Sequence, residues 1–442
     1  MKVCIHNICC DISRCYTDSI ILNEDIKTSE IEGADIICFV TCGYTKDKMK
    51  SCIGELFEIL NKKKKTAKLG VFGCATNYDE FYNALKTVSE IDYIGRGTGK
   101  KMNEEITKYV SNKTSSKDIL IPPVSFGFAT PKRLNIVIQD GCNNRCAFCK
   151  SNYLNLKLNS MPFDEIIETI ELFSSEYNVT EINITGLNTT QYGMDLYKAK
   201  RLAELLKTIG KMSNIETILL DTICIQDMDN ELLNQILNNP KIKRVMIPVQ
   251  TADNRLLSLM GRKNTKEDAD KMFELISKQR PDIFLETIFL ICYPTETFDN
   301  VKKNIEFLNN YNISNPVLSV YEYGYNVSSL KSENIEAMTE EMHYDLLSYY
   351  YENLIPIIEK QRRLLLEKDV EGTLVYRDSL SDYYSTLYRF TTNEYMVETK
   401  KDDNNILFNK KMLSVDFVPS IENVVYQTSP DYGTGRVLKI GK

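Results

Sequence analysis

The sequence predicts an α/β protein made of three parts, and three observations support this. Residues 1–110 alternate between strand-like and helix-like segments. The alternation resumes with a longer repeat from Leu134 to about Tyr323. After residue 367 the chain becomes rich in Tyr, Val, Thr and Asp, which is typical of an all-β domain. We therefore predict a small parallel α/β domain, a central partial (β/α)6 barrel and a small C-terminal β-domain.

The first part predicts a small parallel sheet flanked by helices. Lys46–Lys62 is the clearest helix, because its apolar residues recur at helical spacing. Residues 111–132 are rich in Ser, Lys and Pro and are expected to form a linker, so the N-terminal domain is predicted to cover residues 1–112. The expected strands are Val3–Ile8, Ile36–Val40, Leu69–Phe72 and Tyr93–Ile94.

The second part predicts about six strand–helix units, which make a partial parallel barrel the natural architecture. This domain is expected to cover residues 131–366, with a long helical stretch over Thr339–Glu367. Cofactors bind such sheets at the carboxyl ends of the strands. The expected strands are Leu134–Ile138, Glu181–Ile184, Thr217–Leu220, Arg244–Pro248, Phe284–Leu290 and Val317–Val320. The expected helices lie near Phe163–Ser175, Leu196–Lys207, Asp229–Leu237, Lys266–Ser277 and Phe298–Asn309.

Composition restricts the functional class. The formal net charge of −7 does not favour nucleic acid as the main partner, because phosphate binding depends on clustered Lys and Arg, although a local basic patch could still bind it. No apolar run reaches the length of a membrane span and the N-terminus lacks a signal pattern, so we expect a cytoplasmic protein without a membrane partner. The 13 cysteines then favour metal or redox chemistry over a disulfide frame.

The most informative motif is CxxxCxxC, formed by Cys142, Cys146 and Cys149 directly after a strand-like run. Three thiolates on one loop can hold three irons of a four-iron cluster and leave the fourth iron open to a small chelating molecule. A structural zinc site is one alternative, but zinc usually takes four ligands and the chain has only 2 histidines. A chance group of core cysteines is the other.

A second group of cysteines follows the first three expected strands. Cys10, or its neighbour Cys9, follows the first strand, and Cys42 and Cys74 follow the next two. If these strands are parallel, their carboxyl ends share one edge and the thiols converge into a second cluster site with an open iron. The alternative is that these cysteines are small buried apolar residues. We assign that role to Cys4, Cys38, Cys52, Cys224 and Cys292, and leave Cys15 without one.

At the CxxxCxxC loop the sequence resembles the radical S-adenosylmethionine (SAM) superfamily, whose signature has an aromatic residue before the last cysteine, here Phe148. The resemblance implies a [4Fe–4S] cluster on Cys142, Cys146 and Cys149. It also implies that SAM chelates the open iron and is cleaved reductively to a 5'-deoxyadenosyl radical that abstracts hydrogen.

The whole chain is similar to the radical SAM methylthiotransferases, which combine an N-terminal domain with three scattered cysteines, a radical SAM barrel and a C-terminal β-domain of the TRAM type. We expect the TRAM-like domain at residues 367–442. The segments that carry the resemblance are Ala34–Ile37, Val40–Cys42, Gly73–Ala75, Thr185–Leu196, Pro248–Gln250, Met260–Arg262 and Pro294–Thr297.

The resemblance implies two [4Fe–4S] clusters and two uses of SAM. One SAM methylates a sulfur species at the auxiliary cluster of Cys10, Cys42 and Cys74, and the other gives the radical that activates a C–H bond. Both clusters are then expected to face one substrate pocket, and a flavodoxin or ferredoxin is the expected electron donor. Thr185 and Gly186 lie where the superfamily backbone meets the SAM amino group, unless they form an ordinary strand-end turn. Gln250 and Glu296 are expected in the pocket, unless they only start the following helices.

Within the family, some members modify a transfer RNA adenosine and others an aspartate of a small-subunit ribosomal protein. Asn188–Tyr197 looks more like the ribosomal-protein branch, and residues 367–442 carry 12 acidic and 10 basic side chains, which favours a protein or peptide substrate over RNA. Four departures from the family pattern indicate a divergent member. They are Thr251 in place of a histidine, Ile291–Thr297 in place of Gly-Phe-Pro-Gly-Glu-Thr, Leu285–Glu286 in place of an arginine, and Cys9–Ile12 in place of an intact Gly-Cys-x-x-Asn motif. We therefore also consider a short peptide substrate, a transfer RNA substrate and a single-cluster radical SAM enzyme of another class.

Overall fold

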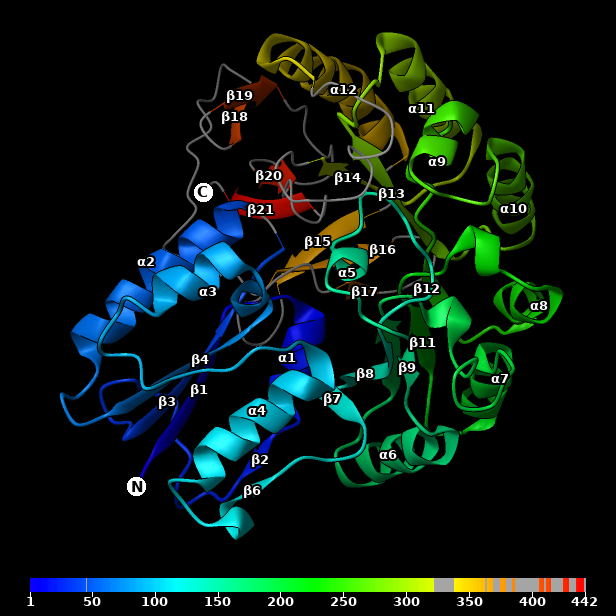
Figure 1. Ribbon diagram of the computed structural model, residues 1–442. Coiled ribbons are helices and arrows are strands. Elements are labelled where there is room, and N and C mark those ends of the chain that lie inside the picture. The colour runs from blue at the N-terminus through cyan, green and yellow to red at the C-terminus, as the bar shows by residue number, and fades with distance from the viewer. Residues whose placement is uncertain are drawn as a thin grey trace. The chain divides into compact units, whose positions relative to one another are not determined.

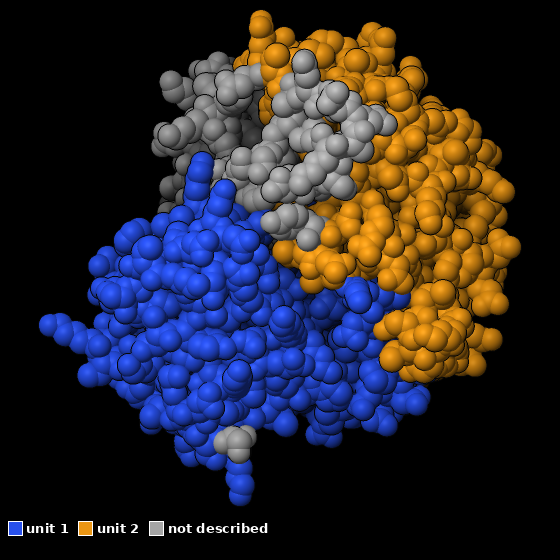
Figure 2. All heavy atoms as spheres, viewed as in Figure 1, with its two compact units in different colours: residues 1–141, 157–186 blue, residues 142–156, 187–442 orange. Residues whose placement is uncertain are grey.

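The computed structural model describes residues 1–44, 46–321 and 338–361, together with short strands between Leu364 and Ile440. Backbone contacts divide the chain into two compact units, coloured separately in Figure 2. Unit 1 contains residues 1–141 and 157–186, and unit 2 contains residues 142–156 and 187–442. The strand and helix order confirms the predicted α/β class.

Unit 1 contains the predicted N-terminal sheet, in the order β1-β3-β4-β5 with every recorded pair parallel. All six residues of β3 are buried, as expected for a parallel strand that is covered on both faces. Helices α2 and α3 lie to one side of this sheet and α4 to the other (Figure 1). The elements are β1 (Val3–Asn7), α1 (Asp11–Asp18), β3 (Ile36–Thr41), α2 (Lys46–Lys62), β4 (Lys68–Gly73), η1 (Cys74–Asn77), α3 (Asp79–Leu85), β5 (Tyr93–Ile94) and α4 (Gly99–Ser111).

The predicted linker at residues 111–132 was wrong, because this segment forms ordered elements. Two aromatic side chains alternate along β7, and Phe126 and Phe128 place their rings 4.5 and 5.5 Å from that of Phe173 on α6. The Ser, Lys and Pro residues nearby hide this alternation in the composition. The elements are β2 (Ile21–Leu22), which pairs with β6 (Ile119–Leu120), then η2 (Ser116–Asp118) and β7 (Ser125–Thr130), which pairs with β8 (Arg133–Asp140).

The six predicted barrel strands all form, two in unit 1 and four in unit 2. In unit 1, β8 pairs in parallel with β10 (Glu181–Gly186), and β9 (Asn159–Ser160) and α6 (Phe163–Glu176) lie between them in sequence. In unit 2, the recorded pairs of neighbouring strands are also parallel. The strands of unit 2 are β11 (Thr217–Leu220), β12 (Ile242–Met246), β13 (Phe284–Ile291) and β14 (Asn315–Val320).

The helices of unit 2 follow the predicted order with two differences. Helix α7 (Leu202–Lys211) begins later than expected, because Gly193 and Tyr192 accept backbone hydrogen bonds from Tyr197 and Arg201 and hold the preceding residues in a loop. Helix α12 (Glu340–Gln361) ends earlier than expected, because β15 starts at Leu364. The other helical segments are α5 (Lys150–Tyr153), η3 (Thr189–Gln191), η4 (Ile225–Asp227), α8 (Asn230–Asn238), α9 (Asn254–Leu259), α10 (Lys266–Gln279) and α11 (Phe298–Asn310).

The C-terminal region contains strands, as the sequence predicts, and their recorded pairings are antiparallel. Much of residues 367–442 lies outside the described residues, so the TRAM-like assignment stays a prediction. Within the described part of the chain, none of the helices combines the length and apolarity of a membrane span. The strands are β15 (Leu364–Lys368), β16 (Leu374–Asp378), β17 (Tyr384–Ser385), β18 (Asn405–Phe408), β19 (Lys411–Ser414), β20 (Val424–Thr428) and β21 (Gly435–Ile440).

Candidate metal and cofactor sites

Four thiols gather at the carboxyl edge of the N-terminal sheet, and we call Cys9, Cys10, Cys42 and Cys74 the auxiliary thiol cluster. The sulfur of Cys9 lies 4.0 Å from that of Cys10 and 3.9 Å from that of Cys74, and it is hydrogen-bonded to Cys42 as well. These residues follow β1, β3 and β4, whose parallel pairing ends all three strands at one edge. The geometry thus brings together the three predicted ligands and Cys9, which was predicted as the alternative to Cys10.

Two glycines allow the loops of this cluster to approach each other. Gly73 has φ +100°, and a Cβ atom there would lie 2.4 Å from the carbonyl oxygen of Thr41. A Cβ atom on Gly43 would lie 2.6 Å from the ring of Tyr78 and 3.0 Å from the backbone of Ala75. Only glycine fits at such contacts without moving the backbone, so both positions fix where Cys42 and Cys74 stand.

The auxiliary thiols perturb one another electrostatically. Hydrogen bonding with Cys10, Cys42 and Cys74, together with burial, raises the pKa of the Cys9 thiol well above its ordinary value. The hydrogen bond that Cys42 receives from Cys9 lowers the pKa of the Cys42 thiol. Cys52, predicted as a core residue, is buried on α2 and its sulfur accepts a hydrogen bond of 3.1 Å from the backbone amide of Cys42.

The CxxxCxxC motif forms a loop in unit 2, and we call residues 142–149 the cluster loop. Its backbone is fixed at two points. The amide of Cys142 donates to the carbonyl of Leu156 at 3.1 Å, and the amide of Ala147 donates to the carbonyl of Met260 at 2.9 Å. Cys146 is buried and Cys142 and Cys149 are half-buried. Burial raises the pKa of the thiols of Cys142 and Cys146.

A hydrogen-bonded network surrounds Cys142, with the carboxylate of Asp227 at its centre. One oxygen of Asp227 accepts from the amide groups of Asn144, Asn188 and Gln191, at 2.7, 2.8 and 3.0 Å. All three residues also reach the thiol of Cys142. The Nδ2 atom of Asn188 and the backbone amide of Asn144 donate to its sulfur at 3.5 and 3.3 Å, and the sulfur donates to the Oε1 atom of Gln191 at 4.0 Å. The network positions this cysteine through side chains of three separate loops.

Cys224 and Arg262 form a second contact beside the cluster loop. Cys224 is buried as predicted and lies in the loop before η4, and its sulfur accepts a hydrogen bond of 3.0 Å from Arg262. A Cβ atom on Gly261 would lie 3.1 Å from the carbonyl oxygen of Arg145, so this turn packs directly against the loop. The guanidinium group of Arg262 lies 5.8 Å from the centre of the Phe148 ring.

The other predicted site residues lie at strand ends, as expected. Thr185 and Gly186 are the last residues of β10, and Thr185 is buried. Gln250 follows β12 with φ +71° and is bridged to β13 through backbone hydrogen bonds with Ile288 and Leu290. Gln250 is buried and lies outside helix α9, which Asp253 caps through the amide of Leu256.

Glu296 is enclosed by hydrogen bonds. One carboxylate oxygen accepts from the amide of Cys292 at 2.5 Å, and the other accepts from the hydroxyl of Tyr350 on α12 at 2.7 Å. Tyr350 contacts Asn304, which accepts from the amide of Ala252 at 2.6 Å. Burial raises the pKa of Glu296 to about 7. The side chain of Glu296 therefore connects the loop after β13 to α12. The N-cap of α11 is Thr297 and not Glu296.

Comparison with known proteins identifies the relationship. Residues 136–308 match the family model described as the radical SAM superfamily. A ribosomal protein uS12 methylthiotransferase, RimO, from Acetivibrio thermocellus is 27% identical over 429 residues, which covers 91% of this chain and 92% of that protein. The corresponding protein from Caldicellulosiruptor saccharolyticus is 31% identical over 294 residues, covering 64% of this chain and 66% of that protein. The chain belongs to the radical SAM methylthiotransferases.

Solved structures of other radical SAM enzymes share the fold of this methylthiotransferase. The radical SAM methyltransferase TsrM from Kitasatospora setae, bound to tryptophan and a SAM analogue, has a TM-score of 0.52 at 12% identity, covering 72% of each chain. The cobalamin-dependent radical SAM enzyme OxsB, bound to aqua-cobalamin and SAM, has a TM-score of 0.50 at 14% identity, covering 81% of this chain and 56% of that chain. These likenesses describe an α/β fold of parallel strands and helices.

The donor sets of the methylthiotransferase fit iron–sulfur clusters, which its superfamily implies. Both groups consist of thiols, the ligands that Fe–S clusters take, and all 13 cysteines are free. Among the described residues, no three or more His, Cys, Asp or Glu side chains are arranged to hold a single metal ion. One oxygen of the nearby carboxylate of Asp227 already accepts hydrogen bonds from three amide groups.

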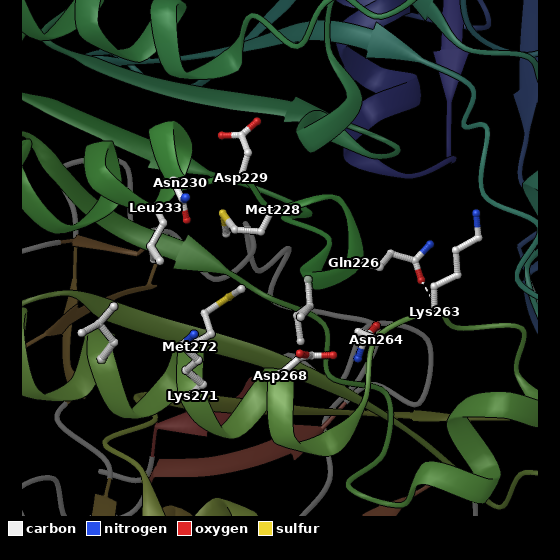
Figure 3. Close-up of a pocket in the computed structure, with 12 residues that line it drawn as sticks. Gln226, Met228, Asp229, Asn230, Leu233, Lys263, Asn264, Asp268, Lys271 and Met272 are labelled. Atoms are coloured by element: carbon white, nitrogen blue, oxygen red, sulfur yellow. Dashed lines mark hydrogen bonds between the residues drawn. The ribbon is translucent and has the colours of Figure 1, made fainter.

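A pocket of about 320 Å³ in unit 2 is lined by residues of η4, α8 and α10 and by Lys263 and Asn264. Figure 3 shows Met228 and Leu233 on one side of it and Met272 and Asp268 on the other. The backbone amide of Lys263 donates to the side chain of Gln226 at 2.9 Å across one end. The pocket contains none of the predicted site residues, so it is separate from the thiols.

Sequence reasoning named Cys9 only as an alternative to Cys10, and it missed the Asp227 network and the Cys224–Arg262 contact. Cys224 and Asp227 follow β11 closely, and Asn188 follows β10. Their position just after parallel strands is the signal that could have found them, because site residues of such sheets collect at those ends.

Proposed function

We propose that this methylthiotransferase replaces a C–H hydrogen of a protein or peptide residue by a methylthio group. One SAM would serve as the methyl donor and a second as the radical source. The main support is the relationship to proteins named as ribosomal protein uS12 methylthiotransferases over most of the chain length. The acidic balance of residues 367–442, the expected TRAM-like domain, also favours a polypeptide over RNA, because an RNA-binding module should be clearly basic.

We assign the cluster loop to the radical-generating site. Cys142, Cys146 and Cys149 would hold three irons of a [4Fe–4S] cluster, and the bound cluster would supply the electron that cleaves SAM. Asp227 and its amide partners hold Cys142 in place, and Arg262 brings a positive charge to the loop. Thr185 and Gly186 at the end of β10 are proposed to meet the SAM amino group, and Gln250 and Glu296 to shape the SAM pocket.

We assign the auxiliary thiol cluster to the sulfur-carrying site, with Cys10, Cys42 and Cys74 as ligands of a second [4Fe–4S] cluster. The convergence of these thiols at one sheet edge supports this assignment. Reduced thiol ligands favour a reducing compartment such as the cytoplasm. A small electron carrier such as flavodoxin or ferredoxin would supply the electron. We propose domain boundaries at residues 1–112, 131–366 and 367–442.

Metal analysis and product analysis test the proposal. The reconstituted chain should hold about eight irons, whereas about four would indicate a single-cluster enzyme. Replacing Cys142, Cys146 and Cys149 by Ala should abolish SAM cleavage. Replacing Cys10, Cys42 and Cys74 together by Ala should leave cleavage but stop methylthio transfer.

The substrate is tested separately by mass spectrometry. Ribosomal protein uS12, short peptides encoded beside this gene and transfer RNA are each incubated with the enzyme, SAM and a reductant. A methylthio mass shift on either polypeptide class supports the proposal. A shift on transfer RNA alone would overturn the assignment of a polypeptide substrate while leaving the enzyme class intact.

A further inference from the structure

The auxiliary thiol cluster contains one thiol more than the proposed function uses. Cys9 contacts each of the other three, with sulfur–sulfur distances of 4.0 Å to Cys10 and 3.9 Å to Cys74 and a hydrogen bond to Cys42. Its backbone is fixed, because the amide of Cys9 donates to the side chain of Asn7 at 2.7 Å. Cys9 is also 6% exposed, so its sulfur faces the other thiols and not the solvent.

Four cysteines are the complete ligand set of a [4Fe–4S] cluster. We propose that Cys9 is a fourth, exchangeable ligand of the auxiliary cluster. Cys9 and Cys10, which both follow β1, can then replace each other as ligands, whereas Cys42 and Cys74 have no substitute. This inference rests on the proposed function, because it needs a cluster at this site. With all four thiolates bound, no iron of the auxiliary cluster is open, and the sulfur species can enter only when Cys9 leaves.

The exchange balances without a redox step. An incoming thiol forms its sulfur–iron bond as the bond between iron and Cys9 breaks, and its proton passes to the sulfur of Cys9. The number of thiolates on the cluster and its charge stay the same. The sulfur of Cys9 leaves by rotation of the side chain about its Cα–Cβ bond, while the hydrogen bond to Asn7 keeps the backbone in place.

Two neighbouring cysteines show why the role falls to Cys9 and not to another residue. Cys10 begins α1 at its N-cap position, is partly exposed, and matches the first-strand ligand of the proposed function. Cys52 is close to Cys42 but contacts its backbone, with distances of 3.1 Å to the amide and 3.5 Å to the carbonyl oxygen. Cys52 therefore supports the loop and offers a matched control.

Iron counting on single and double variants tests the exchange of ligands. Cys9→Ala and Cys10→Ala should each retain the wild-type content of about eight irons, because three thiols remain in both, and the double variant should fall to about four. Cys52→Ala should match the wild type. The inference is overturned if either single variant alone loses the auxiliary irons, since that residue would then be obligatory. If the wild type itself holds about four irons, the two-cluster function fails and the inference falls with it.

A selenium probe tests the closed resting state. Methaneselenol is titrated onto the oxidised wild type and Cys9→Ala in the presence of excess SAM, which occupies the radical site, and iron–selenium scattering is measured by X-ray absorption. Cys9→Ala should bind the probe at least about tenfold more tightly, because no internal thiolate competes. Equal affinities in the two proteins would show that Cys9 is not an iron ligand.

Discussion

The auxiliary thiol cluster and the cluster loop hold their cysteines by different physical means. The auxiliary cysteines come from three strand ends, and close backbone contacts at Gly43 and Gly73 set their positions. The cysteines of the cluster loop are neighbours in sequence, and side chains from other loops hold them, above all Asp227. One site is therefore fixed mainly by backbone packing and the other mainly by polar side chains.

This difference predicts which substitutions damage each site. Adding a single carbon at a glycine should destroy the auxiliary site, because the sheet edge cannot move without breaking strand hydrogen bonds. Removing a polar side chain should loosen the cluster loop, because its neighbours would then bury unpaired amide groups. Comparing iron retention at the two sites in one protein measures both effects against each other.

The largest effect is expected for Gly73→Ala. Its φ of +100° and a Cβ position 2.4 Å from the oxygen of Thr41 force the backbone of β4 to shift. We expect loss of the auxiliary irons, about four per chain, with the other four retained. Gly54→Ala is the matched control, since a Cβ atom there meets nothing within 4 Å, and it should keep both sets of irons. Full iron content in Gly73→Ala would show that backbone packing does not determine where the auxiliary cysteines lie.

The second effect is expected for Asp227→Ala. Three amide groups lose their shared acceptor, and residues that orient a metal ligand typically contribute 10–100-fold to metal affinity. A chelator should therefore remove the irons of the cluster loop about tenfold faster or more, while the auxiliary irons leave at the wild-type rate. Asp299→Ala removes an exposed carboxylate and should change neither rate. Equal acceleration at both sites would point to general destabilisation instead.

The third effect tests whether polar networks in unit 2 make stability depend on pH. The folded-state pKa of Glu296 is about 7 against an ordinary value of 4.5, so the folded chain binds this proton more tightly than the unfolded chain. The stability from this group is complete below about pH 4.5 and is lost as the pH rises through about 7, by up to about 3 kcal/mol. The free energy of unfolding is measured with denaturant between pH 5 and 7.5, on the wild-type apoprotein and on Glu296→Gln. It should fall with rising pH in the wild type and stay level in the variant.

Parallel strands explain why the auxiliary site could be anticipated from sequence. Once β1, β3 and β4 were expected to be parallel, cysteines just after each strand had to meet at one edge. The four predicted strands of this sheet form within about two residues of their expected ends. That Cys9 and Cys10 both lie among the thiols was not predictable, because it depends on the path of one loop and not on a periodic pattern.

Tertiary contacts explain most of what the sequence did not predict. Asp227 accepts from Asn144 and Asn188, which are 83 and 39 residues away in sequence, and no local pattern links them. Residues 196–201 have helical composition, but the hydrogen bond from Arg201 to Tyr192 keeps them in a loop before α7. The strand β7 was hidden because its aromatic alternation is short and lies within a segment rich in Ser, Lys and Pro.

The smallest effect is expected for Gly261→Ala, the counterpart of Gly73→Ala in the cluster loop. Its φ is +71°, and a Cβ atom would lie 3.1 Å from the oxygen of Arg145, a contact that a shift of a few tenths of an ångström relieves. The strain should cost about 1–2 kcal/mol, since an L-residue there adopts a left-handed conformation. The cluster loop should release its irons a few times faster and keep SAM binding, measured by chelation kinetics and calorimetry. Complete loss of these irons would mean that backbone packing limits both sites, and the contrast between them would disappear.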